Sequence, residues 1–235
     1  MSMKAVLFDL DGTLLPMDIR VFLKDYFGRL AKKMAANGYD EKGMMDGLYA
    51  AIGIMANNDG SCTVEEALLK YRLDTFGEKF TEVGNLFDEY YRVEFQEVQK
   101  SCGFNPKAAE TVCKIKEMGY RVILATNPMY PRNATESRIR WAGFLPEDFE
   151  HFTTYEDYHY CKPNLKYYEE VLEKMGLQAE ECLMVGNDVD EDMVAENIGM
   201  KVFLLTADML NKHNKDISAY PQGDLDDLME YIQTL

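Results

Sequence analysis

The sequence predicts an α/β protein: a Rossmann-like, doubly wound parallel sheet with an α-helical bundle inserted after its first strand. Short apolar runs of strand length alternate with segments of helical periodicity over most of the chain, which is typical of an open parallel sheet. Glycines stand where the predicted helices end, the usual place of a C-terminal cap. Between residues 17 and 101 the alternation stops, and helical periodicity continues almost without strand signal.

Apolar runs predict four buried strands, at residues 5–10, 121–125, 181–185 and 201–205, and a weaker candidate at 151–154. Helices are expected between them at about 106–118, 132–142, 164–175 and 190–199, followed by Gly119, Gly143, Gly176 and Gly199. A last helix is expected at about 224–234, and its apolar face would pack on the main domain.

The segment 17–101 predicts a separate helical bundle, because its apolar residues repeat at helical spacing. They form successive stripes: Val21, Phe22, Tyr26, Phe27, Leu30 and Met34; Leu48, Ile52 and Met55; Ala67, Leu68 and Tyr71; Phe87, Tyr90, Tyr91 and Phe95. We therefore expect two domains: a core of residues 1–16 plus 102–235, and an inserted domain of residues 17–101.

Composition limits the partners of the protein. The chain of 235 residues carries a formal charge of −16, which argues against nucleic acid, because phosphate backbones are bound mainly by clustered Lys and Arg. An anionic substrate would be repelled at long range. A phosphate site in this protein therefore needs a local cation.

The cysteines and the N-terminus indicate a cytoplasmic protein. The five cysteines form no CxxC pair, so neither a disulfide framework nor a zinc site is expected, and scattered thiols fit a reducing compartment. The N-terminal segment reaches acids too soon for a signal peptide. No run approaches the ~20 apolar residues of a membrane span. The oligomeric state stays open, and a monomer is compatible with the sequence.

Polar residues follow each predicted strand, where ligands of open α/β sheets bind. They are Asp9, Asp11, Gly12 and Thr13; Thr126 and Asn127; Lys162; and Gly186, Asn187, Asp188 and Asp192. Acids, hydroxyl and amide donors and one lysine are what phosphoryl transfer on a metal requires. Alternate residues of an extended segment point the same way, so Asp9 and Asp11 can face one substrate. Gly12 lets the chain turn and expose N–H groups to a phosphate, and clustered carboxylates suit Mg²⁺.

In order and spacing these residues resemble the haloacid dehalogenase superfamily, in its phosphatase branch with a helical cap. The similar segments are Asp9-Leu10-Asp11-Gly12-Thr13-Leu14, Leu124-Ala125-Thr126-Asn127, Lys162-Pro163, and Met184-Val185-Gly186-Asn187-Asp188 with Asp192 beyond. The resemblance covers nearly the whole chain, and it implies that residues 17–101 form a cap domain over the site.

The resemblance also implies a reaction, the hydrolysis of a small phosphorylated metabolite. Asp9 would be the nucleophile, and Asp11 would be the general acid and then the base. Thr126 and the backbone of Asn127 would hold phosphoryl oxygens, and Lys162 would neutralise charge on Asp9 and the phosphate. Mg²⁺ would lie on the Asp9 carboxylate, the Asp11 carbonyl and an acid of the fourth motif.

The fourth motif departs from the commonest pattern of the family, because Asn187 stands where an acid is usual and Asp188 follows. We expect Asp188 to bind Mg²⁺ directly, since a carboxylate binds hard cations better than an amide, and Asp192 to support the site. Three alternatives remain: a phosphomutase, a 2-haloacid dehalogenase, or a catalytically silent phosphate-binding module. The sequence does not choose among phosphorylated substrates, nor does it say which cap residues face the site.

Overall fold

The computed structural model describes residues 2–235, and within them a six-stranded, wholly parallel sheet forms the centre of the protein. The strand order is β3-β2-β1-β4-β5-β6. The strands are β1 (Ala5–Phe8), β2 (Arg121–Leu124), β3 (His151–Phe152), β4 (Cys182–Gly186), β5 (Lys201–Leu205) and β6 (Gln222–Gly223). This architecture confirms the predicted fold class.

Two details of the predicted strands were wrong. The first strand ends at Phe8 instead of residue 10, because the Leu10 carbonyl accepts the N–H groups of residues 13–15 and the chain turns there. The other error is that the sequence did not predict β6, because this strand has only two half-buried residues and no apolar run. It pairs with β5 through Leu204 and Gln222.

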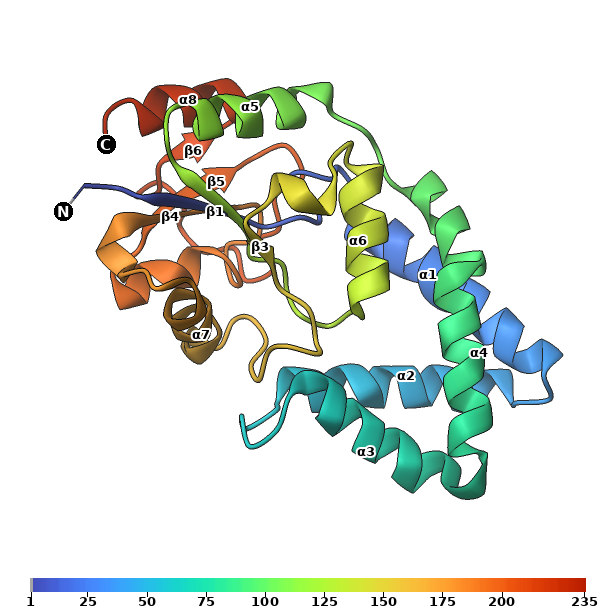
Figure 1. Ribbon diagram of the computed structural model, residues 1–235. Coiled ribbons are helices and arrows are strands. Elements are labelled where there is room, and N and C mark those ends of the chain that lie inside the picture. Colours follow the sequence, from blue (N-terminus) through green and yellow to red (C-terminus); the bar gives the residue numbers. More distant parts are fainter. Residues whose placement is uncertain (1) are drawn as a thin grey trace.

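Helices cover both faces of the sheet: α5 (Pro106–Glu117) and α8 (Leu225–Ile232) on one face, and α7 (Leu165–Met175) on the other (Figure 1). Alternate residues of β1 separate into the two cores. Val6 and Phe8 pack in the core with α5 and α8, and Ala5 and Leu7 pack with α7. This division is the packing that defines a doubly wound sheet.

The helix expected at 190–199 is a 3₁₀ helix, Met193–Ile198. The Asp188 carboxylate accepts the N–H groups of Asp190 and Glu191, and these bonds hold the chain in a turn where an α-helix would otherwise begin. The four glycines expected to end helices all have positive φ, between 62° and 94°, so left-handed caps stand where the sequence indicated.

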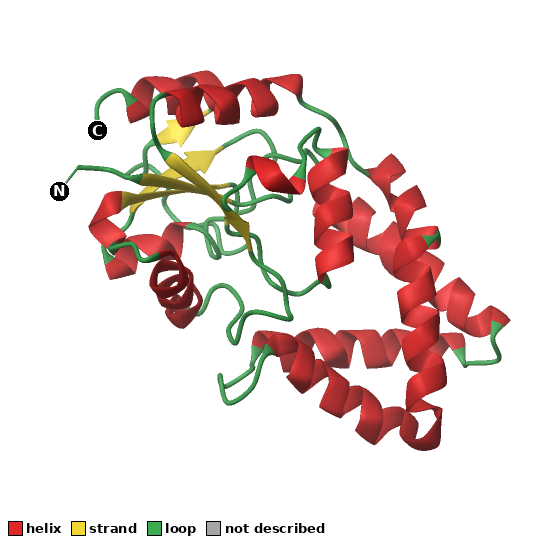
Figure 2. Cartoon of the chain, in the orientation of Figure 1, coloured by secondary structure: helices red, strands yellow, loops and turns green. Residues whose placement is uncertain are grey.

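Between β1 and β2 the chain forms a set of helices, which Figure 2 shows beside the sheet. They are α1 (Ile19–Ala36), α2 (Glu41–Ala56), α3 (Val64–Phe76), α4 (Phe80–Arg92) and the 3₁₀ segments Gly77–Lys79 and Glu94–Ser101. Side chains of Asp18, Asp40 and Thr63 cap the first three helices. One predicted stripe residue was wrong: Val21 is exposed, since it is adjacent to the buried Phe22 and points about 100° away from it.

The helical insertion and the sheet domain share one hydrophobic core. Phe22 and Leu30 of α1 belong to the same cluster as Val6 and Phe8 of β1. The boundary between residues 17–101 and the rest of the chain therefore stays a prediction. None of the helices in residues 2–235 has the length and apolar character that crossing a membrane requires.

Candidate active site at the carboxyl edge of the sheet

Parallel register brings the predicted site residues to one edge of the sheet. Phe8, the last residue of β1, lies opposite Leu124 of β2 and Val185 of β4, so the segments that follow these strands start at the same level. A cavity of about 750 Å³ opens at this edge. Its lining includes every predicted catalytic and metal residue: Asp9, Asp11, Thr126, Lys162, Asp188 and Asp192.

Lys162 lies between two carboxylates at the base of the cavity. Its Nζ is 2.9 Å from Asp9 Oδ1 and 2.6 Å from Asp192 Oδ1, and its side chain is 1% exposed. Burial disfavours the ammonium charge, but the attraction of Asp192 and Asp9 outweighs it and raises the pKa of Lys162 well above its ordinary value. The lysine therefore keeps its positive charge beside Asp9.

Asp192 connects this lysine to the loop that follows β4. One oxygen accepts from Lys162, and the other accepts the N–H of Asp188 at 3.0 Å. Gly186 is required for this approach, because a Cβ at that position would overlap the Asp192 carboxylate. Both carboxylate oxygens of Asp192 thus have protein partners, which suits a residue that positions its neighbours.

Asp11 is paired with a residue that the sequence did not indicate, Arg138 of α6 (Arg132–Trp141). Arg138 is fully buried, donates from Nη1 to Asp11 Oδ2, and lies 4.0 Å from the centre of the Tyr130 ring. Burial raises the pKa of Asp11, against the opposing charge of Arg138. A signal did exist: Arg138 is three residues before Trp141 and four after Ala134, on the inward face of a predicted helix.

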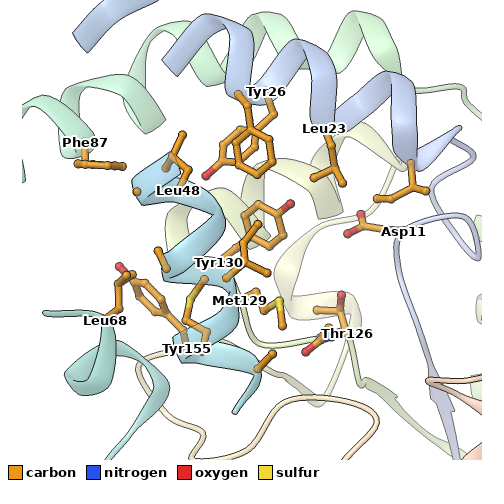
Figure 3. A pocket seen from close by; sticks show the side chains of 18 of the residues that line it. Asp11, Leu23, Tyr26, Leu48, Leu68, Phe87, Thr126, Met129, Tyr130 and Tyr155 are labelled. Carbon is orange, nitrogen blue, oxygen red and sulfur yellow. The ribbon is translucent and has the colours of Figure 1, made fainter. Parts of the chain in front are cut away.

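One oxygen of Asp11 has no protein partner. Asp11 Oδ1 is buried and accepts no hydrogen bond from the described residues, although a buried oxygen of this kind is normally satisfied. Asp11 lies at one side of the cavity, near Leu23 and on the same side as Thr126 (Figure 3). The free oxygen is therefore available to a ligand that brings its own donor.

Asn187 and Asp188 have different surroundings. The Asn187 side chain accepts the Thr13 hydroxyl at 3.0 Å and donates to the Asp208 carbonyl at 2.7 Å, so both ends of its amide are engaged. Asp188 Oδ2 lies 3.3 Å from Nζ of Lys212, a partly exposed lysine that the sequence reasoning missed. Asp188 Oδ1 accepts the N–H groups of Asp190 and Glu191, so Oδ2, whose partner is the exposed Lys212, is the more available oxygen of the two residues.

The remaining predicted residues position the loops around the site. Asn127 accepts the Lys162 N–H at 3.2 Å and donates to Glu191 at 3.0 Å. Thr126 is held through its carbonyl, which accepts the hydroxyls of Thr153 and Tyr167.

Gly12 has a φ of 82°, and a Cβ there would overlap Asn187. Its own N–H donates to the Leu15 carbonyl at 2.8 Å, and a role of this turn in binding the substrate phosphate stays a prediction.

The charge balance of the site fits a divalent cation. Five acids line this end of the cavity (Asp9, Asp11, Asp188, Glu191 and Asp192), and three cations pair with them: Lys162, Lys212 and Arg138. Burial raises the pKa of Asp11, Glu191 and Asp192, because a buried carboxylate loses its hydration. No three His, Cys, Asp or Glu side chains of residues 2–235 cluster as a ready metal site. Asp9 and Asp188 could bind Mg²⁺ together with a main-chain carbonyl. Such a site needs only two acids, so it does not require a cluster of three.

Carboxylates around one buried lysine, at the carboxyl edge of a parallel sheet with a helical insertion after β1, define an enzyme of Rossmann-like fold. The chain belongs to the haloacid dehalogenase-like hydrolase family, whose model matches residues 3–199.

Two similar proteins are named for their action on phosphate compounds. The chain is 27% identical over 214 residues to glyceraldehyde 3-phosphate phosphatase of Methanothermobacter thermautotrophicus, covering 88% of this chain and 87% of that one. It is 25% identical over 201 residues to pyrophosphatase PpaX of Bacillus cereus, covering 86% and 82%.

Solved structures share the fold over the full length of the chain. A 2-haloacid dehalogenase from Pseudomonas syringae superposes with a TM-score of 0.66 at 20% identity and covers 99% of each chain. A phosphatase of the family from Thermococcus onnurineus superposes with a TM-score of 0.58 at 20% identity and covers 98% of each. At these identities the superpositions establish the fold alone.

Proposed function

We propose that the protein is a Mg²⁺-dependent phosphatase that hydrolyses a small phosphate monoester through an aspartyl-phosphate on Asp9. The observation that carries this proposal is the pairing of Asp9 with the buried Lys162, 2.9 Å away, on the wall of the same cavity as Asp11. The family and the two phosphatase relatives support phosphate chemistry.

Asp9 acts as the nucleophile in this proposal. Lys162 binds Oδ1, while Oδ2 has only a long contact of 3.4 Å with the Thr13 hydroxyl, so Oδ2 is the oxygen free to attack phosphorus. Lys162 holds a positive charge where negative charge develops on the phosphoryl oxygens, a kind of stabilisation that is strong in a buried site. Thr126 and Asn127 would hold those oxygens. Bound Mg²⁺ on Asp9, the Asp11 carbonyl and Asp188 would supply the further positive charge that the site lacks.

Asp11 serves as the acid and then the base. Burial raises the pKa of Asp11, which suits a carboxyl that takes up and releases a proton during the reaction, and the unpartnered Oδ1 can pass a proton to the leaving oxygen. The same oxygen then takes a proton from the water that attacks the aspartyl-phosphate, which regenerates Asp9. Arg138 binds the other oxygen and so restricts rotation of the carboxyl.

The test is release of inorganic phosphate from acetyl phosphate and p-nitrophenyl phosphate, with Mg²⁺ and with EDTA. We expect turnover with Mg²⁺, none with EDTA, and essentially none from Asp9→Asn, whereas Asp46→Asn on the exposed face of α2 should behave as wild type. Phosphate release separates a phosphatase from a phosphomutase, and chloride release from 2-chloropropionate would reveal a dehalogenase. Undiminished turnover by a folded Asp9→Asn protein would refute the proposal.

A further inference from the structure

The cavity that contains Asp9 extends far into the helical insertion. Figure 3 shows Asp11 and Thr126 on one side of it, and Leu48, Leu68 and Phe87 on the opposite side. These three residues come from α2, α3 and α4, so each of these helices contributes to the far wall. The volume of about 750 Å³ belongs to a single space that is continuous with the site.

The wall contributed by the insertion is mostly apolar and is not filled by the protein. Leu48, Ile52, Leu68 and Phe87 all line the cavity and are only half-buried, although residues of these types are among the most often fully buried. The sequence indicated them as bundle core, but the helices leave a hollow between them. Apolar surface kept open at an active site is what a ligand with an apolar group would cover.

The tyrosines of the wall turn their hydroxyls toward the protein. The hydroxyls of Tyr26 and Tyr91 bond each other at 2.7 Å, and that of Tyr71 donates to the Gly47 carbonyl at 3.2 Å. Their rings, and not their polar ends, are left for a ligand. The guanidinium of Arg72 lies 4.7 Å from the centre of the Phe87 ring, and its buried Nε has no hydrogen-bond partner among the described residues.

A short hydroxylated fragment fits this wall poorly. It would occupy a small part of the cavity, whose volume corresponds to about 25 molecules of liquid water. Over most of the wall its hydroxyls would meet rings and methyl groups, since, apart from the tyrosines, the polar side chains that the insertion contributes are Asp40, Arg72, Thr75 and Asp88. Burying a hydroxyl without a partner costs about 1–3 kcal/mol. An apolar group gains free energy at the same surface.

We propose that this cavity binds the organic group of the substrate, and that the group is apolar: an alkyl or aryl chain attached to the phosphate. The inference rests on the proposed phosphatase function, and it adds the chemical class of the ester. Phosphorus would lie at Asp9 and Lys162, and the chain would run along α2 toward Phe87.

The test on the wild-type protein is the series of n-alkyl phosphates from ethyl to decyl phosphate, with acetyl phosphate as the reference. We expect kcat/KM to rise about fourfold for each added methylene until the cavity is filled, which corresponds to ~0.8 kcal/mol per methylene. Glucose 6-phosphate and glycerol phosphate should be poorer substrates than hexyl phosphate.

Two matched variants on α2 locate the effect. Ile52→Gln places an amide in the cavity wall, and we expect the ratio of kcat/KM for decyl over ethyl phosphate to fall about tenfold. Ile54→Gln makes the same change two residues away on a side chain outside the lining, and should leave that ratio at the wild-type value. Calorimetric titration with decylphosphonate should show the same difference in affinity, which separates binding from turnover.

The outcomes distinguish the two levels of the proposal. If acetyl phosphate is hydrolysed but the alkyl series is flat or falls with length, the phosphatase function stands and the apolar substrate class is wrong. Equal effects of Ile52→Gln and Ile54→Gln would show that the apolar group does not bind at the cavity wall that contains Ile52. If neither acetyl phosphate nor any ester in the series releases phosphate, the phosphatase function is wrong, and the inference fails with it.

Discussion

The buried ion pair between Arg138 and Asp11 allows a quantitative test of how the proposed acid is held. Arg138 is completely buried, and the Asp11 side chain is 17% exposed. The guanidinium also donates to the Thr135 hydroxyl at 3.2 Å and stacks on Tyr130. Arg138→Met removes all three interactions and keeps an apolar side chain of similar length in the space.

The expected loss of stability follows from the burial of the pair. Removing one partner of a buried ion pair costs about 3–5 kcal/mol, because the remaining charge is left without compensation. Asp11 keeps some contact with solvent, so we expect the lower end, about 3 kcal/mol. In an Asp11→Asn background no charge is stranded, and Arg138→Met should then cost less, with a coupling energy of about 2 kcal/mol between the two positions.

The assay is urea denaturation of the four proteins of this double-mutant cycle, in EDTA so that metal binding does not contribute. Arg140→Met is the matched control, because Arg140 is on the same helix, half-exposed, and pairs only with Glu136 at the surface. That control should change stability by less than about 0.5 kcal/mol. The reasoning is refuted if Arg138→Met costs no more than the control, or if the coupling energy is below about 0.5 kcal/mol.

Three further predictions concern the loop after β4 and the sheet. Asp188→Ala should raise the Mg²⁺ concentration for half-maximal activity much more than Asn187→Ala, and the opposite ranking would assign the metal to the amide. Gly186→Ala should lower activity about tenfold or more, since the added methyl group would displace Asp192. Wild-type kinetics in this variant would show that the close approach of Asp192 to Gly186 is not needed for activity. Burial lowers the pKa of His151, so its stabilisation is present above the ordinary pKa of 6.5 and lost as the pH falls below it. Denaturation at pH 7 and 5.5 should therefore show a steeper loss in wild type than in His151→Gln, and equal slopes would exclude this effect.

The strands and helix ends could be predicted because their signals are local. Buried parallel strands are continuous apolar runs, and glycines such as Gly119 and Gly176 end helices with positive φ. The residues that follow the strands were predictable for the same reason: Asp9, Thr126 and Asp188 come within two residues of the ends of β1, β2 and β4, and parallel strands end at one edge.

Partners across the fold could not be read from the sequence. Lys162 is 30 residues from Asp192, and Arg138 is 127 residues from Asp11, so neither pairing has a signature in spacing. Helical periodicity places Arg138 on the inward face of its helix. It does not identify Asp11 as the partner, which only the folded structure shows.

The sequence by itself determined the sheet, the place of the helical insertion and the edge at which the acids gather, because each depends on periodicity and chain order. Tertiary structure alone decided what the apolar stripes of the insertion face. Phe22 and Leu30 of α1 pack into the common core, whereas Leu48 and Ile52 of α2 border a cavity. The physical reason is that the hydrophobic effect is not directional. An apolar stripe predicts that a helix face is shielded from water, but only the arrangement of the helices determines whether a side chain or an open cavity lies against that face.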